Sequence, residues 1–273
     1  MAADRPYDSS RADLSNSIFL SSFESFQTID LGRGSFNDTS TRTMVAKDEI
    51  RRGRTTTILI FGQSNGANSG AVAYTPIHRV LNFNLFDGNC YVARDPLLGA
   101  TEANGNFASR MADTLIARGF CDTAVLVPIS VGGSRIEEWT TGGVRHRRLQ
   151  VAIKRTLDAG LVFTHLLWHQ GESNAGEGAD YRAYVDSFMN IHRALRSYGV
   201  TAPVYVAQAS VCNSSPNETI RSAQRALVDQ SHEISAGPDT DTIGLEDRFD
   251  GCHMAESGLV RHAELWVEVL TRG

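Results

Sequence analysis

The sequence predicts a three-layer α/β fold, in which helices cover both faces of a doubly wound parallel sheet of about five strands. Two features of the chain carry this prediction. Short apolar runs are typical of strands that are buried on both sides. Between these runs, apolar residues recur every three or four positions, as they do on one face of a helix. Strands and amphipathic helices that alternate along a chain form parallel sheets.

Five apolar segments are predicted to be strands. The first is Thr57–Phe61, which ends at a glycine. Residues 66–104, which follow it, are predicted to be a long loop, and loops of this length usually serve a function. The other four predicted strands are Ala124–Ile129, Leu161–Trp168, Val204–Gln208 and Thr242–Leu245.

Five apolar stripes predict helices that pack on the sheet. Gly119, Gly160 and Gly199 end the first three, and Asn217 is expected to cap the fourth. The stripes are Phe107, Met111 and Leu115; Leu149, Ile153 and Leu157; Tyr181, Tyr184, Phe188, Ile191 and Leu195; Ile220, Ala223, Leu227 and Val228; and Leu259, Trp266 and Val269.

The chain is predicted to form one domain over residues 55–273, preceded by an N-terminal arm over residues 1–54 that is extended or partly disordered. The net charge of −5 argues against nucleic-acid binding, because affinity for phosphates comes from clustered Lys and Arg. A basic stretch from Arg145 to Arg155 is predicted to be a solvated helix face.

The sequence contains no recognisable targeting signal, membrane helix or cofactor motif. No run reaches the roughly 20 apolar residues of a membrane helix, so no membrane partner is expected. The N-terminus lacks the apolar core of a signal peptide. A chain trimmed of its signal would look the same, so the protein is secreted or periplasmic in that case and cytoplasmic otherwise. No metal or organic cofactor motif is present, and none is expected.

The four cysteines contain no Cys-x-x-Cys pair, which disfavours a zinc site. Cys212 and Cys252 both fall in segments predicted near the rim of the active site. A disulfide between them and two buried thiols are both compatible with the sequence. Cys90 and Cys121 complete the set.

Small residues at two predicted strand ends are suited to ester chemistry. Ser64 follows the first strand between Gly62 and Gly66, where a parallel sheet presents a nucleophile. An ordinary glycine-rich turn has the same composition. Gly132 and Gly133 follow the second strand, and a backbone N–H at such a pair can stabilise an oxyanion.

The third predicted strand is followed by an unusually polar segment, His169-Gln170-Gly171-Glu172-Ser173-Asn174. The side-chain amide of Gln170 or Asn174 can donate to an oxyanion. Glu172 can hold the loop by accepting backbone N–H groups, or can bind a substrate hydroxyl. His169 is interpreted as a structural residue rather than a base.

Asp250 and His253 stand three residues apart on a predicted turn before the last helix. This spacing lets the carboxylate accept a hydrogen bond from Nδ1–H of the imidazole, so that Nε2 can take a proton from a serine. The pair by itself is common, but here it accompanies the loops that follow three strands.

These motifs resemble the conserved blocks of the SGNH hydrolases, a flavodoxin-like fold family. The resemblance is closest to the carbohydrate-esterase branch that includes sialate O-acetylesterase-like and acetylxylan-esterase-like proteins, and it covers about Thr56 to Leu270. The motifs are Gly62-Gln63-Ser64-Asn65; Gly132-Gly133-Ser134 with Ile136 and Trp139; Trp168-His169-Gln170-Gly171-Glu172; and Asp250 with His253.

The resemblance implies a Ser64–His253–Asp250 triad that cleaves O-acetyl esters on a carbohydrate. The implied oxyanion hole consists of the Ser64 N–H, a glycine N–H from the second block and a side-chain amide from the third. Gly133 is preferred over Gly132 for the glycine, and Gln170 is preferred over Asn174 for the amide.

Other functions remain open. The Gly-x-Ser-x-Gly pattern also fits an α/β-hydrolase elbow, but in that fold the Asp and His lie far apart in sequence. An esterase or thioesterase for lipid-like acyl groups and a non-catalytic carbohydrate-binding relative are the alternatives. The polar residues of the long loop favour a sugar over an acyl chain; they include Asn68, Ser69, Asn82, Asn84 and Asp87.

Overall fold

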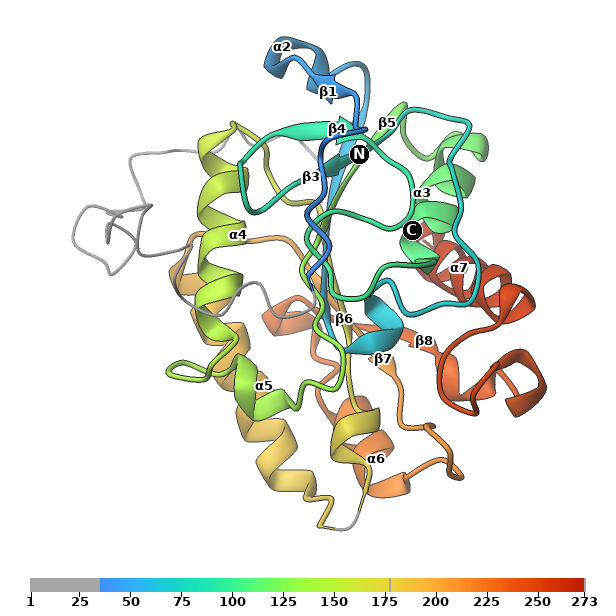
Figure 1. The fold of residues 1–273 in the computed structure, drawn as a ribbon. Coiled ribbons are helices and arrows are strands. Elements are labelled where there is room, and N and C mark those ends of the chain that lie inside the picture. Colours follow the sequence, from blue (N-terminus) through green and yellow to red (C-terminus); the bar gives the residue numbers. More distant parts are fainter. Residues whose placement is uncertain (1–34, 177, 273) are drawn as a thin grey trace.

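The computed structural model describes residues 35–176 and 178–272 (Figure 1). Residues 1–34, the greater part of the predicted N-terminal arm, lie outside the described residues. The rest of that arm contains the short strand β1 (Met44–Val45) and the one-turn helix α2 (Lys47–Ile50). Before them, Phe36 exchanges main-chain hydrogen bonds with Gly99 and Ala100, so this part of the arm lies along the loop that precedes Thr101.

Eight strands form one sheet in the described residues, in the order β1-β4-β3-β5-β2-β6-β7-β8. The neighbours from β3 to β8 are parallel, whereas β4 runs antiparallel to β1 and β3. The predicted parallel sheet is confirmed, with more strands than expected. Beyond β1 the strands are β2 (Thr55–Gly62), β3 (Val80–Phe83), β4 (Cys90–Val92), β5 (Thr123–Pro128), β6 (His165–His169), β7 (Val204–Gln208) and β8 (Ile234–Asp239).

Helices cover both faces of this sheet, as predicted for a doubly wound fold (Figure 1). Leu59 and Phe61 of β2 pack in the core beneath α4, α5 and α6, whereas Ile58 and Ile60 pack beneath α3 and α7. Alternate residues of a strand point to opposite faces, which explains why β2 is apolar without interruption. The helices are α3 (Phe107–Ala117), α4 (His146–Asp158), α5 (Tyr181–Ser197), α6 (Glu218–Ala226) and α7 (Glu256–Thr271).

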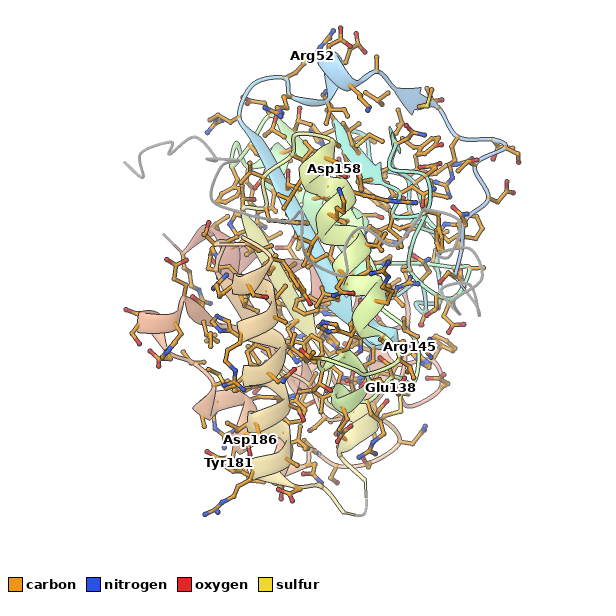
Figure 2. All side chains as sticks on the ribbon, turned by 90° about the vertical axis from the view of Figure 1, so that its left-hand side faces the viewer. Arg52, Glu138, Arg145, Asp158, Tyr181 and Asp186 are labelled. Atoms are coloured by element: carbon orange, nitrogen blue, oxygen red, sulfur yellow. A yellow bond between two sulfur atoms is a disulfide. The ribbon has the colours of Figure 1, made fainter. Side chains whose placement is uncertain are left out.

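The outer surface of α4 and α5 is polar (Figure 2). Asp158 ends α4, and Tyr181 and Asp186 are exposed on α5. Just before α4, Arg145 Nε lies 3.1 Å from Glu138 Oε2. Ion pairs in contact with solvent add little stability, so the apolar faces beneath these helices hold them in place.

The prediction of a solvated basic face on α4 is wrong for Arg148 and Arg155, whose side chains are buried. Arg148 donates from Nε to Ile129 O (2.7 Å) and from Nη2 to Gly99 O. Arg155 likewise donates to a main-chain carbonyl in the loop after β3. A guanidinium group has five donors, so each arginine can satisfy buried carbonyls of loops that lack regular pairing.

The predicted strand at Thr242–Leu245 is also wrong, because the last strand lies upstream and is followed by two 3₁₀ turns. Asp239 begins the first turn, since its side chain accepts the N–H of Asp241. Gly237 and Pro238 interrupt the apolar pattern of β8, but a proline is tolerated in a strand at the edge of a sheet. The two turns are η7 (Thr240–Thr242) and η8 (Leu245–Asp247).

The predicted loop over residues 66–104 contains β3 and β4, and several of its polar side chains serve the loop itself. Asn82 accepts from Leu98 N (2.6 Å), and Asn68 accepts from Leu97 N (2.9 Å). Asn82, Asn84 and Asn68 are fully buried. The expectation that the asparagines at 82 and 84 suit a sugar ligand is therefore wrong, because they bind the protein instead.

Candidate functional site

The loops after β2, β5, β6 and β7 meet at the edge of the sheet where the parallel strands end, the usual ligand position in such sheets. A pocket of about 670 Å³ opens there. Its lining includes Ser64, Gly132, Gly133, Glu172 and His253, which come from four separate parts of the chain. The structure therefore brings most of the residues selected from the sequence into one cavity.

Ser64 begins η3 (Ser64–Gly66) directly after β2, and it is buried. Gly62 has φ +124°, and a Cβ there would lie 2.0 Å from His169 O. A Cβ on Gly66 would lie 2.7 Å from Ser130 Oγ. Only glycine fits at such close approaches. The two glycines thus let the turn that carries the serine pack against the loops after β5 and β6.

Gln63 was given no role by the sequence analysis, yet it lines the pocket and joins two loops. Its Oε1 accepts from Gly171 N (3.2 Å), Ser173 N (2.9 Å) and the side-chain amide of Gln170 (3.2 Å). These bonds fix the amide oxygen toward the loop after β6, so that the amide nitrogen is left as a donor. The sequence could have indicated a role for Gln63, because this polar residue directly precedes the candidate nucleophile Ser64.

The turn over residues 250–253 holds an imidazole against a carboxylate. Asp250 Oδ2 lies 2.7 Å from His253 Nδ1, and Oδ1 accepts from the backbone N–H of Cys252 (2.9 Å) and His253 (2.7 Å). Burial raises the pKa of Asp250, but the hydrogen bonds from His253 and Cys252 outweigh it and lower the pKa below its usual value. With Nδ1 donating to this carboxylate, Nε2 of the imidazole is the proton acceptor.

Two links hold this turn against the rest of the site. A disulfide joins Cys252 to Cys212 in the loop after β7, which settles the alternatives that the sequence left open. Cys252 O also accepts from Asn65 Nδ2 (3.2 Å) and Arg248 Nη1 (2.6 Å). Because Asn65 Nδ2 donates to Glu172 Oε1 as well (2.9 Å), this one amide connects three of the loops around the pocket.

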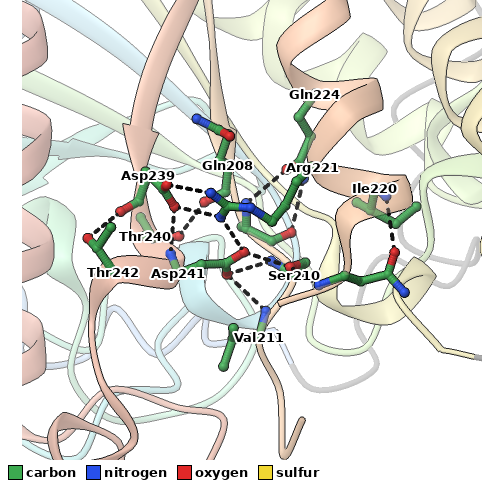
Figure 3. A network of polar contacts seen from close by, with 12 residues as sticks. Gln208, Ser210, Val211, Ile220, Arg221, Gln224, Asp239, Thr240, Asp241 and Thr242 are labelled. Carbon is green, nitrogen blue, oxygen red and sulfur yellow. Dashed lines mark hydrogen bonds and ion pairs between the residues drawn. The ribbon is translucent and has the colours of Figure 1, made fainter. Parts of the chain in front are cut away.

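A polar network fixes the loop that carries the other half of the disulfide (Figure 3). Arg221 of α6 contacts Asp239 (Nη2–Oδ2 2.6 Å) and Asp241 (Nη1–Oδ2 2.8 Å). Asp241 accepts from the backbone N–H of Ser210 (2.8 Å) and Val211 (2.9 Å). Burial raises the pKa of Asp241, but these bonds prevail and lower it. The backbone that leads into the disulfide is therefore held by charge-assisted hydrogen bonds.

His169 and Glu172 form a buried pair beneath the pocket. His169 Nε2 lies 3.1 Å from Glu172 Oε1, and both side chains are almost fully excluded from solvent. Burial raises the pKa of Glu172, but His169 and Asn65 together lower it below its usual value. Glu172, the first residue of η5 (Glu172–Asn174), thus holds its loop through the side chains of His169 and Asn65.

The two amides proposed for the oxyanion hole do not line the pocket. Gln170 Nε2 lies within hydrogen-bond distance of Gln63 Oε1, Ser134 O and Asn174 Oδ1 (3.2, 3.3 and 2.6 Å). Asn174 Nδ2 donates to Glu137 Oε1 (3.0 Å). Both amides therefore tie the loop after β6 to η4 (Ile136–Trp139) and its flanks.

Within residues 35–176 and 178–272, no group of three or more His, Cys, Asp and Glu side chains is placed to hold a metal ion. In the same part of the chain, no helix combines the length and the apolar character that a membrane crossing requires.

Residues 54–271 match a protein family described as carbohydrate esterase, sialic acid-specific acetylesterase. A probable carbohydrate esterase of Arabidopsis thaliana is 25% identical over 143 residues, which are 51% of this chain and 53% of the relative. The match thus spans about half the length of that relative.

Solved structures share the fold. The structure of the Arabidopsis protein has a TM-score of 0.67 at 18% identity, covering 81% of this chain and 99% of the other. The crystal structure of NanS has a TM-score of 0.53 at 14% identity, with 79% and 96% covered. Esterase EstA from Pseudoalteromonas sp. has a TM-score of 0.52 at 13% identity, with 80% and 97% covered.

Proposed function

This chain belongs to the carbohydrate esterase family described as sialic acid-specific acetylesterases, and we propose that it removes O-acetyl groups from a carbohydrate through Ser64, His253 and Asp250. The observation that carries the proposal is the shared pocket: Ser64 and His253 both line it, and His253 Nδ1 is held by Asp250 at 2.7 Å. These are the elements of a serine nucleophile with an oriented base.

The proposed reaction has two steps. Ser64 Oγ attacks the acetyl carbonyl while His253 Nε2 takes its proton. The tetrahedral intermediate then collapses as His253 gives that proton to the leaving sugar oxygen, which yields the free sugar hydroxyl and an acetyl-enzyme. Water then attacks the acetyl group, with His253 again as base, and releases acetate and free Ser64. Asp250 stabilises the imidazolium in both steps and remains ionised.

Backbone donors for the oxyanion are available at Ser64 and Gly133. Gly132 N already donates to Thr101 Oγ1 (2.7 Å), so we assign the second N–H to Gly133, whose φ of +67° suits glycine. Gln63 is a candidate for the third donor. Its side-chain oxygen accepts from the loop after β6, so its side-chain nitrogen is left to donate into the pocket. For Gln170 to take this role, its amide would have to leave its three interior acceptors.

Acetate release from O-acetylated sugars tests the proposed function. We expect release from acetylated xylans or acetylated sialic acids, and we expect p-nitrophenyl acetate to be cleaved faster than esters with acyl groups longer than butyryl. Strong preference for the long acyl groups would point instead to a lipid-like substrate. Binding of acetylated sugars without any release of acetate would point to a non-catalytic carbohydrate-binding protein.

Activity is expected to fall toward acidic pH, because the imidazole must be neutral to accept the serine proton. Because the pKa of Asp250 is lowered, its carboxylate stays ionised from pH 5 to 9 and causes no loss of activity in that range. The measurement is kcat/KM for p-nitrophenyl acetate from pH 5 to 9. A profile that is flat across the whole range would contradict a histidine base.

A further inference from the structure

The charged side chains that line the pocket are acidic. Of the lining residues, Glu102 and Glu172 are carboxylates, and the described lining includes no lysine or arginine. A ligand that carries its own carboxylate would therefore find no cationic partner in this cavity. Recognition of carboxylates usually relies on arginine, because its guanidinium group offers two parallel donors.

Part of the charge of Glu172 is offset within the protein. Its side chain is only 2% exposed, and it contacts His169 and Asn65. Arg248 is buried and interacts electrostatically with Glu172, while its guanidinium group donates to carbonyls behind the pocket, including Cys252 O. Arg248 offsets part of the charge of Glu172, and Glu172 is buried, so Glu102 is the exposed carboxylate of the pocket lining.

Glu102 is held at the rim by an unusual backbone. It has φ +68°, in the left-handed region that residues other than glycine rarely adopt. Neighbouring bonds impose this conformation, because Thr101 N donates to Ser130 O (3.1 Å) and Asn68 Nδ2 donates to Glu102 O (3.3 Å). Strained backbone of this kind persists where the surroundings over-determine it, and it is frequent at functional sites.

This backbone directs the Glu102 carboxylate to the proposed oxyanion hole. A Cβ on Gly132 would lie 2.5 Å from Glu102 Oε1, so the carboxylate oxygen lies directly over that glycine. Gly133, the proposed backbone donor, is the next residue. Glu102 is exposed and forms no ion pair within residues 35–176 and 178–272.

We propose that the substrate is an uncharged O-acetylated sugar, and that Glu102 discriminates against O-acetylated sugars that carry a carboxylate. The inference rests on the proposed deacetylase function and adds the charge class of its substrate. It separates this chain from the substrate that the family's description mentions, since a sialic acid carries a carboxylate. At pocket distances and an intermediate dielectric, repulsion between two carboxylates amounts to about a tenfold effect on kcat/KM.

The test uses two substrates that differ only in charge: an O-acetylated sialic acid glycoside and the same compound with its carboxylate converted to a carboxamide. Acetate release gives kcat/KM for the wild type, for Glu102→Gln and for Glu268→Gln, which removes the same charge from the exposed side of α7. We expect the wild type to prefer the carboxamide by about tenfold at low salt, and less so as salt screens the charge. Glu102→Gln should bring the ratio close to one, and Glu268→Gln should leave it unchanged.

Two outcomes would overturn the inference: equal rates on both substrates in the wild type, or a preference that Glu102→Gln does not reduce. Failure of the proposed function gives a different result, because the wild type would then release no acetate from either compound or from acetylated xylan. That result would remove the basis of this inference as well. The ratio of two substrates on one variant cancels changes in folding or in the intrinsic reactivity of Ser64.

Discussion

Replacing Ser64 with alanine is expected to lower kcat for p-nitrophenyl acetate by about ten-thousand-fold, with no change in the circular dichroism spectrum. Removing Oγ removes the atom that is proposed to attack the carbonyl. The fold tolerates the change because Ser64 is held through its backbone, where Ala67 N donates to Ser64 O (2.8 Å).

Ser69→Ala is the matched control, because Ser69 lines the same pocket and loses the same hydroxyl. It should retain activity within a few-fold of the wild type. If Ser64→Ala retained turnover at the level of Ser69→Ala, Ser64 would not be the nucleophile.

Removing the disulfide is expected to have the second largest effect. A bridge that closes a 40-residue separation contributes about 4 kcal/mol to the free energy of unfolding. Cys252 lies between Asp250 and His253, so Cys212→Ser with Cys252→Ser should also lower kcat/KM by about tenfold to a hundredfold through misplacement of the imidazole.

Urea unfolding and kinetics on the folded double variant measure the two effects separately. A reductant should bring the wild type to the level of the double variant and should leave that variant unchanged, because Cys90 and Cys121 are buried thiols with no partner to lose. Full stability and full activity of the double variant would show that the hydrogen bonds to Cys252 O position the turn without the disulfide.

The strands that carry the site were predictable because they are buried on both faces. β2, β5 and β7 are apolar over most of their length, so their positions follow from local composition. Asn217 caps α6 by accepting from Ile220 N (3.1 Å), as the sequence pattern predicts. Since parallel strands end at one edge, the topology then brought Ser64 and His253 into one pocket.

Features that depend on distant partners could not be read from the sequence. Arg148 stands in a basic stretch that resembles a solvated helix face, but its side chain is buried and donates to main-chain carbonyls in two loops. The edge strand β8 lacks an apolar period because most of its side chains are only partly buried or exposed. The side-chain oxygen of Gln63 accepts from donors in the loop after β6, whereas the side-chain nitrogen of Gln170 has acceptors that include Gln63 and Asn174. Neither set of partners follows from the residue type.

The alternatives at the proposed oxyanion hole were open for the same physical reason. Gly132 and Gly133 are adjacent, and either N–H fits a sequence pattern. The bond from Gly132 N to Thr101 Oγ1 distinguishes them, and Thr101 belongs to a segment that the sequence analysis treated as loop. Which backbone N–H groups stay free to bind a ligand therefore depends on tertiary hydrogen bonds and not on residue type.

The most direct test of the proposed mechanism is to look for the acetyl-enzyme. The protein is mixed with an O-acetylated sugar, quenched in acid within the first turnovers, digested and examined by mass spectrometry. We predict that the peptide with Ser64 gains the mass of one acetyl group, and that the Ser64→Ala variant gains none. Acetate release from a protein whose Ser64 peptide never carries an acetyl group would contradict the mechanism.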